Sequence, residues 1–149
     1  MNNQEIRAFI AIELNEQIKS LALKIQNKLK KYHKNIKWVD PKNIHITLQF
    51  LGNVDLIQIK TISKIIEKVC QNHRPFCIKT KNIEMFPAQK PQIISLGIIK
   101  KETSLKNLAI ELGSSLSKIG FSRKNDFAAH ITLARIKHLN NINQLKKRY

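Results

Sequence analysis

The clearest pattern along the chain is a strict alternation of apolar and polar residues between Ile44 and Leu48. A period of two residues is typical of a β-strand that buries one of its faces. Ile44, Ile46 and Leu48 are therefore expected to face the core. His45 and Thr47 then project side by side from the opposite face.

The same four residues, His-Ile-Thr-Leu, stand at positions 45–48 and again at 130–133, 85 positions later. His130 and Thr132 are therefore expected to share one face of a second strand. If the two strands lie beside each other, two imidazoles and two hydroxyls line one cleft. Such a cleft can hold an anion between a proton donor and a proton acceptor.

Hydrophobic periodicity and turn residues predict the other elements, and the order they give fits two similar halves better than a parallel βαβ array. We expect strands at 76–81 and 93–99 to pair in antiparallel fashion. The remaining elements are a strand at 6–14, a helix capped by Asn15 that reaches about Tyr32, a helix that follows a turn at Gly52–Asn53, and a helix with Gly120 as its C′ residue.

The composition predicts one domain, since 149 residues of which 42% are hydrophobic can build a proper core. Lys and Arg number 27 against 10 Asp and Glu, a formal charge of +17. This excess favours a polyanionic partner, first nucleic acid and second an acidic membrane surface. A composition biased toward Lys, Asn and Ile, with lysines on solvated helix faces, explains the charge equally well.

Cysteine content and hydropathy indicate in which compartment the protein is located. Cys70 and Cys77 form neither a disulfide framework nor a zinc knuckle, so we expect reduced thiols and a cytoplasmic protein. The first residues do not resemble a signal peptide, and no apolar run approaches the length of a transmembrane helix. We therefore expect no membrane span, and of the two polyanionic partners we expect nucleic acid and no membrane.

Two histidines around a phosphodiester can divide the work of an in-line displacement. One neutral imidazole removes a proton from the attacking water, and one imidazolium protonates the leaving oxygen. Thr47 and Thr132 can hydrogen-bond the other phosphate oxygens, and Arg135 is the nearest cation to the second motif. Each motif offers one strong metal ligand and has no Asp/Glu cluster beside it, so we expect neither a metal nor a cofactor.

One His-X-Thr motif is a weak signal, since a strand histidine is often only a structural residue at the rim of a sheet. Two copies in the same apolar frame favour a functional reading. Together they resemble the 2H phosphoesterase superfamily, and most closely the bacterial and archaeal RNA 2′,3′-cyclic phosphodiesterases, also called 2′-5′ RNA ligases. The matching blocks are Arg7–Ala11, Trp38–Gly52, Phe86–Pro87 with 93–99, and His130–Arg135.

The resemblance implies one α+β domain over residues 1–149, with two pseudo-symmetric lobes, antiparallel sheets that meet at a central cleft, and helices packed outside. It also implies metal-independent opening of RNA 2′,3′-cyclic phosphate ends to 2′-phosphates, with tRNA fragments or short oligonucleotides as substrates. The implied roles are general acid for His45, general base for His130, phosphate binding for Thr47, Thr132 and Arg135, and base stacking for Phe50.

Three features depart from the family pattern. Ala129 stands where relatives often have proline, with little expected effect on the chemistry. The C-terminal end is shorter than usual for the family, which can expose a sheet edge that pairs with a second copy, so a dimer is the alternative to the monomer that we expect by default. Strict alternation places Phe50 and Arg135 opposite the histidines, so their roles require a bulge or strong twist at each strand end.

Two other functions remain compatible with the same residues. The reverse reaction would ligate RNA through a 2′-5′ linkage, and it uses the same acid and base. A non-catalytic basic module on this fold would bind RNA without turning it over. The intact motifs favour an enzyme, and the high concentration of water favours hydrolysis.

Overall fold

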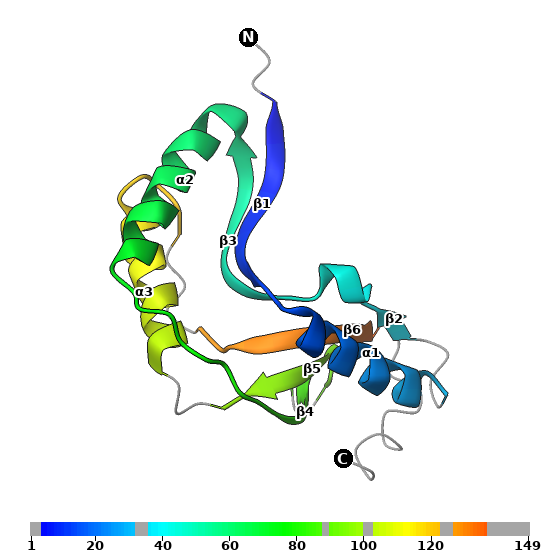
Figure 1. Ribbon diagram of the computed structural model, residues 1–149. Helices are drawn as coiled ribbons and strands as arrows, with labels where there is room; N and C mark the ends of the chain where they lie inside the picture. Colours follow the sequence, from blue (N-terminus) through cyan, green and yellow to red (C-terminus); the bar gives the residue numbers. More distant parts are fainter. Residues whose placement is uncertain (1–3, 32–35, 88–89, 100–102, 123–126, 137–149) are drawn as a thin grey trace. The chain divides into compact units, whose positions relative to one another are not determined.

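The computed structural model describes residues 4–31, 36–87, 90–99, 103–122 and 127–136 (Figure 1). Within this part of the chain, no helix has the length and apolar character needed to cross a membrane. The predicted α+β class is confirmed. The elements are β1 (Glu5–Glu13), α1 (Glu16–Lys30), β2 (Ile36–Trp38), the 3₁₀ turn η1 (Pro41–Asn43), β3 (His45–Asp55), α2 (Leu56–Gln71), β4 (Thr80–Phe86), β5 (Ile93–Ile98), α3 (Thr103–Ser117) and β6 (His130–Ile136).

The chain forms two compact units and passes between them several times. The first unit contains Met1–Ile12, Thr47–Ile78 and Lys100–Ala129, and the second contains Glu13–Ile46, Lys79–Ile99 and His130–Tyr149. One boundary therefore falls inside the first motif, and another falls immediately before the second motif. Both motif histidines belong to the second unit.

In the first unit, β1 and β3 pair in a two-stranded sheet, and α2 and α3 lie side by side (Figure 1). Hydrophobic periodicity predicted both helices, and each has an apolar stripe whose buried members recur at helical spacing. Buried residues of these stripes are Ile62 and Val69 in α2 and Leu105, Leu108, Leu112 and Leu116 in α3.

The second unit is an antiparallel sheet of order β2-β6-β5-β4 with α1 packed against one face. Leu29 of α1 contacts Ile94 and Ala134 in the buried core of this unit. Further side chains around this cluster are Ile25, Ile36, Trp38, Ile83, Met85 and Ile136. These contacts identify the sheet residues that face α1, and the residues between them in sequence face the other way.

Two predicted helix ends are confirmed by their hydrogen bonds. The backbone N–H of Ile18 donates to the side-chain oxygen of Asn15 at 3.0 Å, which makes Asn15 the N-cap of α1. After α3, Gly120 adopts a φ of +94°, and the N–H of Phe121 donates to the carbonyl of Leu116 at 3.2 Å. This is the Schellman arrangement, in which the residue after the helix adopts a left-handed conformation that glycine tolerates best.

The strand predicted at 76–81 is wrong, since β4 spans Thr80–Phe86. Its neighbour β5 and the predicted antiparallel pairing of the two strands are confirmed. Apolar and polar residues alternate at 76–79, and they alternate again around Ile83 and Met85. The later register prevails because it places Ile83 and Met85 in the core against α1.

The turn expected at Gly52–Asn53 is also wrong, because β3 continues through it and α2 begins only at Leu56. The N-cap of α2 is Asp55, whose carboxylate accepts from the N–H of Ile57 at 3.0 Å. In return, the N–H of Asp55 donates to the side chain of Gln58 at 3.3 Å. This capping box places the start of the helix three residues after the predicted turn.

Polar side chains join the C-terminal end of α2 to α3 through Glu111. Its carboxylate accepts from the amide of Asn72 at 3.1 Å and contacts Nε2 of His73 at 2.8 Å. The hydrogen bond from Asn72, followed by the one from His73, lowers the pKa of Glu111 below its ordinary value of 4.5.

We expect Glu111→Gln to destabilise the protein at neutral pH and to have no effect in strong acid. Because the pKa of Glu111 is lowered by folding, its contribution is complete above the ordinary pKa of 4.5 and is lost as the pH falls through the lowered value. Urea unfolding at neutral and acidic pH measures this difference. Glu67→Gln, an exposed position on α2, is the control, and an equal effect of both substitutions at neutral pH would contradict the assignment.

Candidate active site

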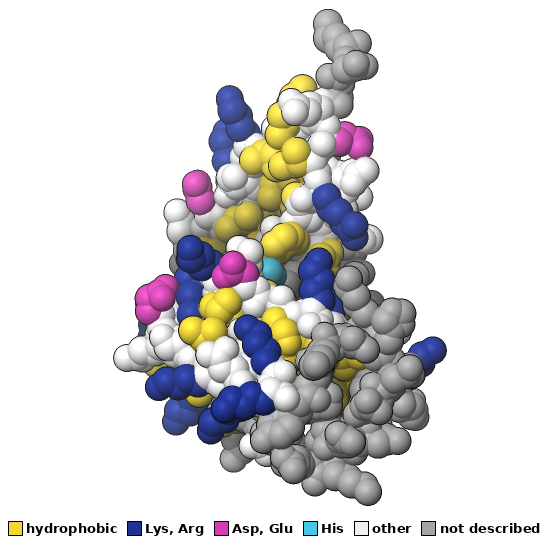
Figure 2. Space-filling view, turned by 90° about the vertical axis from the view of Figure 1, so that its right-hand side faces the viewer, with side chains coloured by type: hydrophobic (Ala, Val, Ile, Leu, Met, Phe, Trp, Pro, Cys, Tyr) yellow, Lys and Arg dark blue, Asp and Glu magenta, His cyan; other side chains and the backbone are white. Residues whose placement is uncertain are grey.

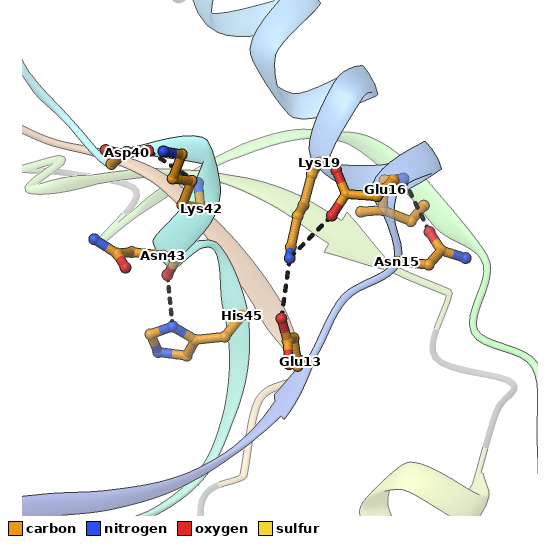
Figure 3. A network of polar contacts seen from close by, with 9 residues as sticks. Glu13, Asn15, Glu16, Lys19, Asp40, Lys42, Asn43 and His45 are labelled. Carbon is orange, nitrogen blue, oxygen red and sulfur yellow. Dashed lines mark hydrogen bonds and ion pairs between the residues drawn. The ribbon is translucent and has the colours of Figure 1, made fainter.

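His45 begins β3 and is separated from the turn η1 by Ile44. The carboxylate of Asp40 accepts from the N–H of Lys42 at 2.9 Å, and the N–H of Asn43 donates to the carbonyl of Asp40 at 2.8 Å. This turn directs the carbonyl of Asn43 at Nδ1 of His45, 2.7 Å away (Figure 3). His45 is half-buried between the buried residues Ile44 and Ile46, as the alternation predicted.

The contact with Asn43 determines which nitrogen of His45 can exchange a proton. A carbonyl oxygen only accepts hydrogen bonds, so Nδ1 of His45 must carry hydrogen and act as the donor. The proton that is gained or lost therefore resides on Nε2. The turn fixes the imidazole in the orientation and tautomer that suit a proton transfer through Nε2.

Two carboxylates in the region of Figure 3 are bonded to Lys19. Its Nζ lies 3.1 Å from Oε1 of Glu13 and 3.3 Å from Oε1 of Glu16. These hydrogen bonds, with Glu13 as the largest contributor, raise the pKa of Lys19 above its ordinary value of 10.5. The single charge of the lysine thus offsets one of the two negative charges at the start of the second unit.

The second motif forms the start of β6. His130 and Thr132 are half-buried, whereas Ile131 and Leu133 are buried, as the alternation predicted. His130 is paired with Gly97 of β5, on the sheet face opposite α1, since its neighbour Ile131 is paired with the core-facing row.

A β-bulge in β6 changes the face on which the following residues lie. Ile94 pairs with Ala134 and Ser95 pairs with Thr132, so Leu133 is an extra residue between two consecutive pairs. Ala134 faces α1 with its partner Ile94, and Thr132 faces the other way with Ser95. Without the bulge, Thr132 and Ala134 would share a face.

The bulge also determines where Arg135 lies. Arg135 pairs with Ile93, the neighbour of Ile94, and therefore projects from the face opposite α1, together with His130 and Thr132. Strict alternation would have placed Arg135 on the other face. The bulge that the role of Arg135 requires is therefore present in β6.

A buried glutamine of α1 holds this bulge. Gln26 is fully buried, and its Nε2 donates to the carbonyl of Leu133 at 3.0 Å and to the carbonyl of Val39 at 2.7 Å. The N–H of Val39 donates to the same carbonyl of Leu133 at 3.0 Å. Sequence reasoning missed Gln26, although a polar residue between the buried Ala22 and Leu29 of the helix was a signal that could have found it.

Other side chains on this face surround His130. The ring centroid of Phe86 lies 6.1 Å from that of His130, with the rings tilted by 44°. Lys81 and Glu84 form an ion pair over Gly97, where an added Cβ would lie 2.7 Å from Cε of Lys81. Phe86 stood in a matching block of the sequence but received no predicted role.

Thr47 and Phe50 lie further along β3, in the first unit. Thr47 is half-buried, as the alternation predicted. Burial then changes phase, because Leu48 and Gln49 are both buried and Phe50 is 52% exposed. The ring centroid of Phe50 lies 6.3 Å from that of Phe9, which is 48% exposed. The two rings form an exposed aromatic pair.

The sequence left open whether the two motif strands lie beside each other, and within the described sheets they are not neighbours. Among the described strands, β3 pairs with β1, and β6 pairs with β2 and β5. Long-range packing determines which strands pair with each other, and the alternation of residues within one strand carries no information about it. No group of three or more His, Cys, Asp or Glu side chains with metal-binding geometry occurs among the described residues.

Comparisons with known proteins agree with the motif assignment. Residues 12–94 match the family model described as LigT-like phosphoesterase. The chain is 32% identical to the RNA 2′,3′-cyclic phosphodiesterase of Aquifex aeolicus, over 97% of this chain and 79% of that protein. It is 37% identical to the protein of the same name from Thermotoga maritima, over 89% and 71% of the two chains.

A solved structure, that of E. coli LigT complexed with 3′-AMP, matches with a TM-score of 0.72 and 25% identity. The match covers 89% of this chain and 73% of LigT. The family resemblance expected from the two motifs is thus confirmed by an independent sequence match, by close relatives and by the fold. The chain belongs to the LigT-like phosphoesterase family.

Proposed function

We propose that this protein opens the 2′,3′-cyclic phosphate at the end of an RNA chain and leaves a 2′-phosphate, without a metal ion or cofactor. Its relatives from Aquifex aeolicus and Thermotoga maritima carry the name RNA 2′,3′-cyclic phosphodiesterase. The observation that carries the proposal from the family to this chain is the pair of half-buried motif histidines, His45 and His130, in one compact unit.

The two imidazoles have complementary roles in this reaction. Neutral His130 removes a proton from water, and the water oxygen attacks phosphorus. The bond between phosphorus and the 3′ oxygen breaks, and His45 delivers a proton to that oxygen while the phosphate stays on the 2′ oxygen. The hydrogen bond from Nδ1 of His45 to the carbonyl of Asn43 supports this role, because it assigns the transferable proton to Nε2.

The negative charge that develops on the phosphate needs hydrogen-bond donors and a cation. We assign these roles to the hydroxyls of Thr47 and Thr132 and to the guanidinium of Arg135. The bulge in β6 supports the role of Arg135, because it directs this side chain to the face of His130 and Thr132. Phe50 is assigned to the terminal base, and its 52% exposure supports a stacking role.

The proposal is tested by incubating the purified protein with an oligoribonucleotide that ends in a 2′,3′-cyclic phosphate, in the presence and absence of EDTA. We expect a product that ends in a 2′-phosphate, at a rate that EDTA does not change. Chromatography that separates 2′- from 3′-phosphate products measures the outcome. A 3′-phosphate product, or loss of turnover on chelation, would contradict the mechanism.

Two further outcomes of the same experiment are informative. RNA binding without any product would indicate a non-catalytic binding module. Addition of an RNA with a 5′-hydroxyl end tests the reverse reaction, and a joined 2′-5′ product that accumulates in excess of the hydrolysed product would identify a ligase.

A further inference from the structure

Two exposed cations stand directly opposite each other on the face that carries the second motif. Lys37 of β2 pairs with Arg135 of β6, so both side chains project from the same face of the sheet. Trp38, the neighbour of Lys37, belongs to the cluster against α1. Lys37 therefore shares the face of His130 and Thr132.

Like charges that lie directly opposite each other across two strands destabilise the sheet. Among the described residues, neither Lys37 nor Arg135 forms an ion pair with a carboxylate. Glu84, an acidic residue on the same face, is ion-paired to Lys81. In the described part of the chain, two cations without a carboxylate partner therefore stand next to each other, which is the electrostatic basis of an anion site.

A cyclic phosphate end carries one negative charge, which the threonines and Arg135 bind in the proposed function. An RNA chain carries a second charge on the phosphodiester that precedes the terminal nucleoside. Among the described strands, β2 is the outer one beside β6, one strand spacing, about 4.8 Å, away. Lys37 therefore extends the positive charge from the motif strand toward the sheet edge, where a longer chain can continue into solvent.

We propose that Lys37 binds the phosphodiester on the 5′ side of the terminal nucleoside, so that the site prefers oligoribonucleotides to cyclic mononucleotides. This inference rests on the proposed function, since it takes the terminal phosphate to lie at the second motif. A lysine suits this task because its ammonium is a compact charge on a flexible stem, which can follow a phosphate without fixing a sequence. Lys and Arg side chains, dark blue in Figure 2, also outnumber acidic ones on the surface in that view.

The test compares two substrates, adenosine 2′,3′-cyclic monophosphate and the dinucleotide ApA that ends in a 2′,3′-cyclic phosphate. We expect Lys37→Ala to lower the ratio of kcat/KM for the dinucleotide to kcat/KM for the mononucleotide by roughly fivefold or more. Lys37→Arg should keep most of the wild-type ratio, because arginine carries the same charge. Lys24→Ala, which removes an exposed lysine from α1, should leave the ratio unchanged.

An unchanged ratio in Lys37→Ala, or an equal fall in Lys24→Ala, would overturn the inference. If the wild-type protein turns over neither substrate, the proposed function fails, and binding of an oligoribonucleotide with a 2′-phosphate end decides the inference. Lys37→Ala should then lower the slope of log affinity against log salt by about 0.7, the loss of one phosphate contact. If the slope for Lys37→Ala equals the slope for Lys24→Ala, the contact between Lys37 and the phosphodiester is refuted.

Discussion

Replacement of His130 by alanine is expected to lower kcat for opening of the cyclic phosphate by at least about 10²-fold, because no other side chain is proposed to remove the proton from water. His45→Ala should cost a similar factor through loss of the proton donor. Because acid and base act in the same displacement, the double variant should be little slower than the slower single variant. Single-turnover kinetics with a cyclic-ended oligoribonucleotide measures all three.

His73→Ala is the matched control for these substitutions. His73 is a histidine of the first unit, bonded to Glu111, and has no proposed role in the chemistry. We expect its kcat to equal that of the wild-type protein at a temperature where all variants are folded. Near-normal turnover in His130→Ala or His45→Ala would remove that residue from the mechanism.

A change of leaving group distinguishes the acid from the base. A p-nitrophenolate leaves without protonation, so a nucleoside p-nitrophenyl phosphodiester should be hydrolysed by His45→Ala with a much smaller loss than the cyclic substrate shows. His130→Ala should remain impaired on both substrates, because water still has to be deprotonated. The opposite pattern would exchange the two roles.

Local sequence signals predicted those features that depend on neighbouring residues. Asn15 caps α1 because its short side chain reaches the free N–H groups of the first turn, and Gly120 ends α3 because glycine tolerates a positive φ. The half-buried histidines and threonines of the two motifs follow in the same way from a period of two residues. These properties require no knowledge of what the strand packs against.

Features that depend on pairing between distant strands could not be predicted from the sequence. The register of β4 is decided by packing of Ile83 and Met85 against α1, and the bulge at Leu133 exists only relative to β5. The face of Arg135 follows from that bulge. Strict alternation along one strand places the arginine on the other face, so the sequence could give the bulge only as a requirement of the role expected for Arg135.

The bulge at Leu133 leads to the second strong prediction, which concerns Gln26, 107 positions away in sequence. Gln26→Met keeps an unbranched side chain of similar size but removes the amide that donates to Leu133 and Val39. The buried carbonyl of Leu133 then keeps only the N–H of Val39, and the half-buried carbonyl of Val39 loses the amide, so we expect the free energy of unfolding to fall by about 2 kcal/mol. Urea unfolding measures this loss, with Asn27→Ala at the exposed adjacent position as the control.

Gln26 is also expected to position Arg135 through the bulge. If so, Gln26→Met should raise KM for the cyclic-ended substrate about tenfold while the protein is still folded, because a small displacement of a phosphate-binding group is costly. In an Arg135→Ala background the same substitution should have no further effect on KM, since the group it positions is absent. An additive effect on KM, or lost stability with an unchanged KM, would restrict Gln26 to stabilising the fold.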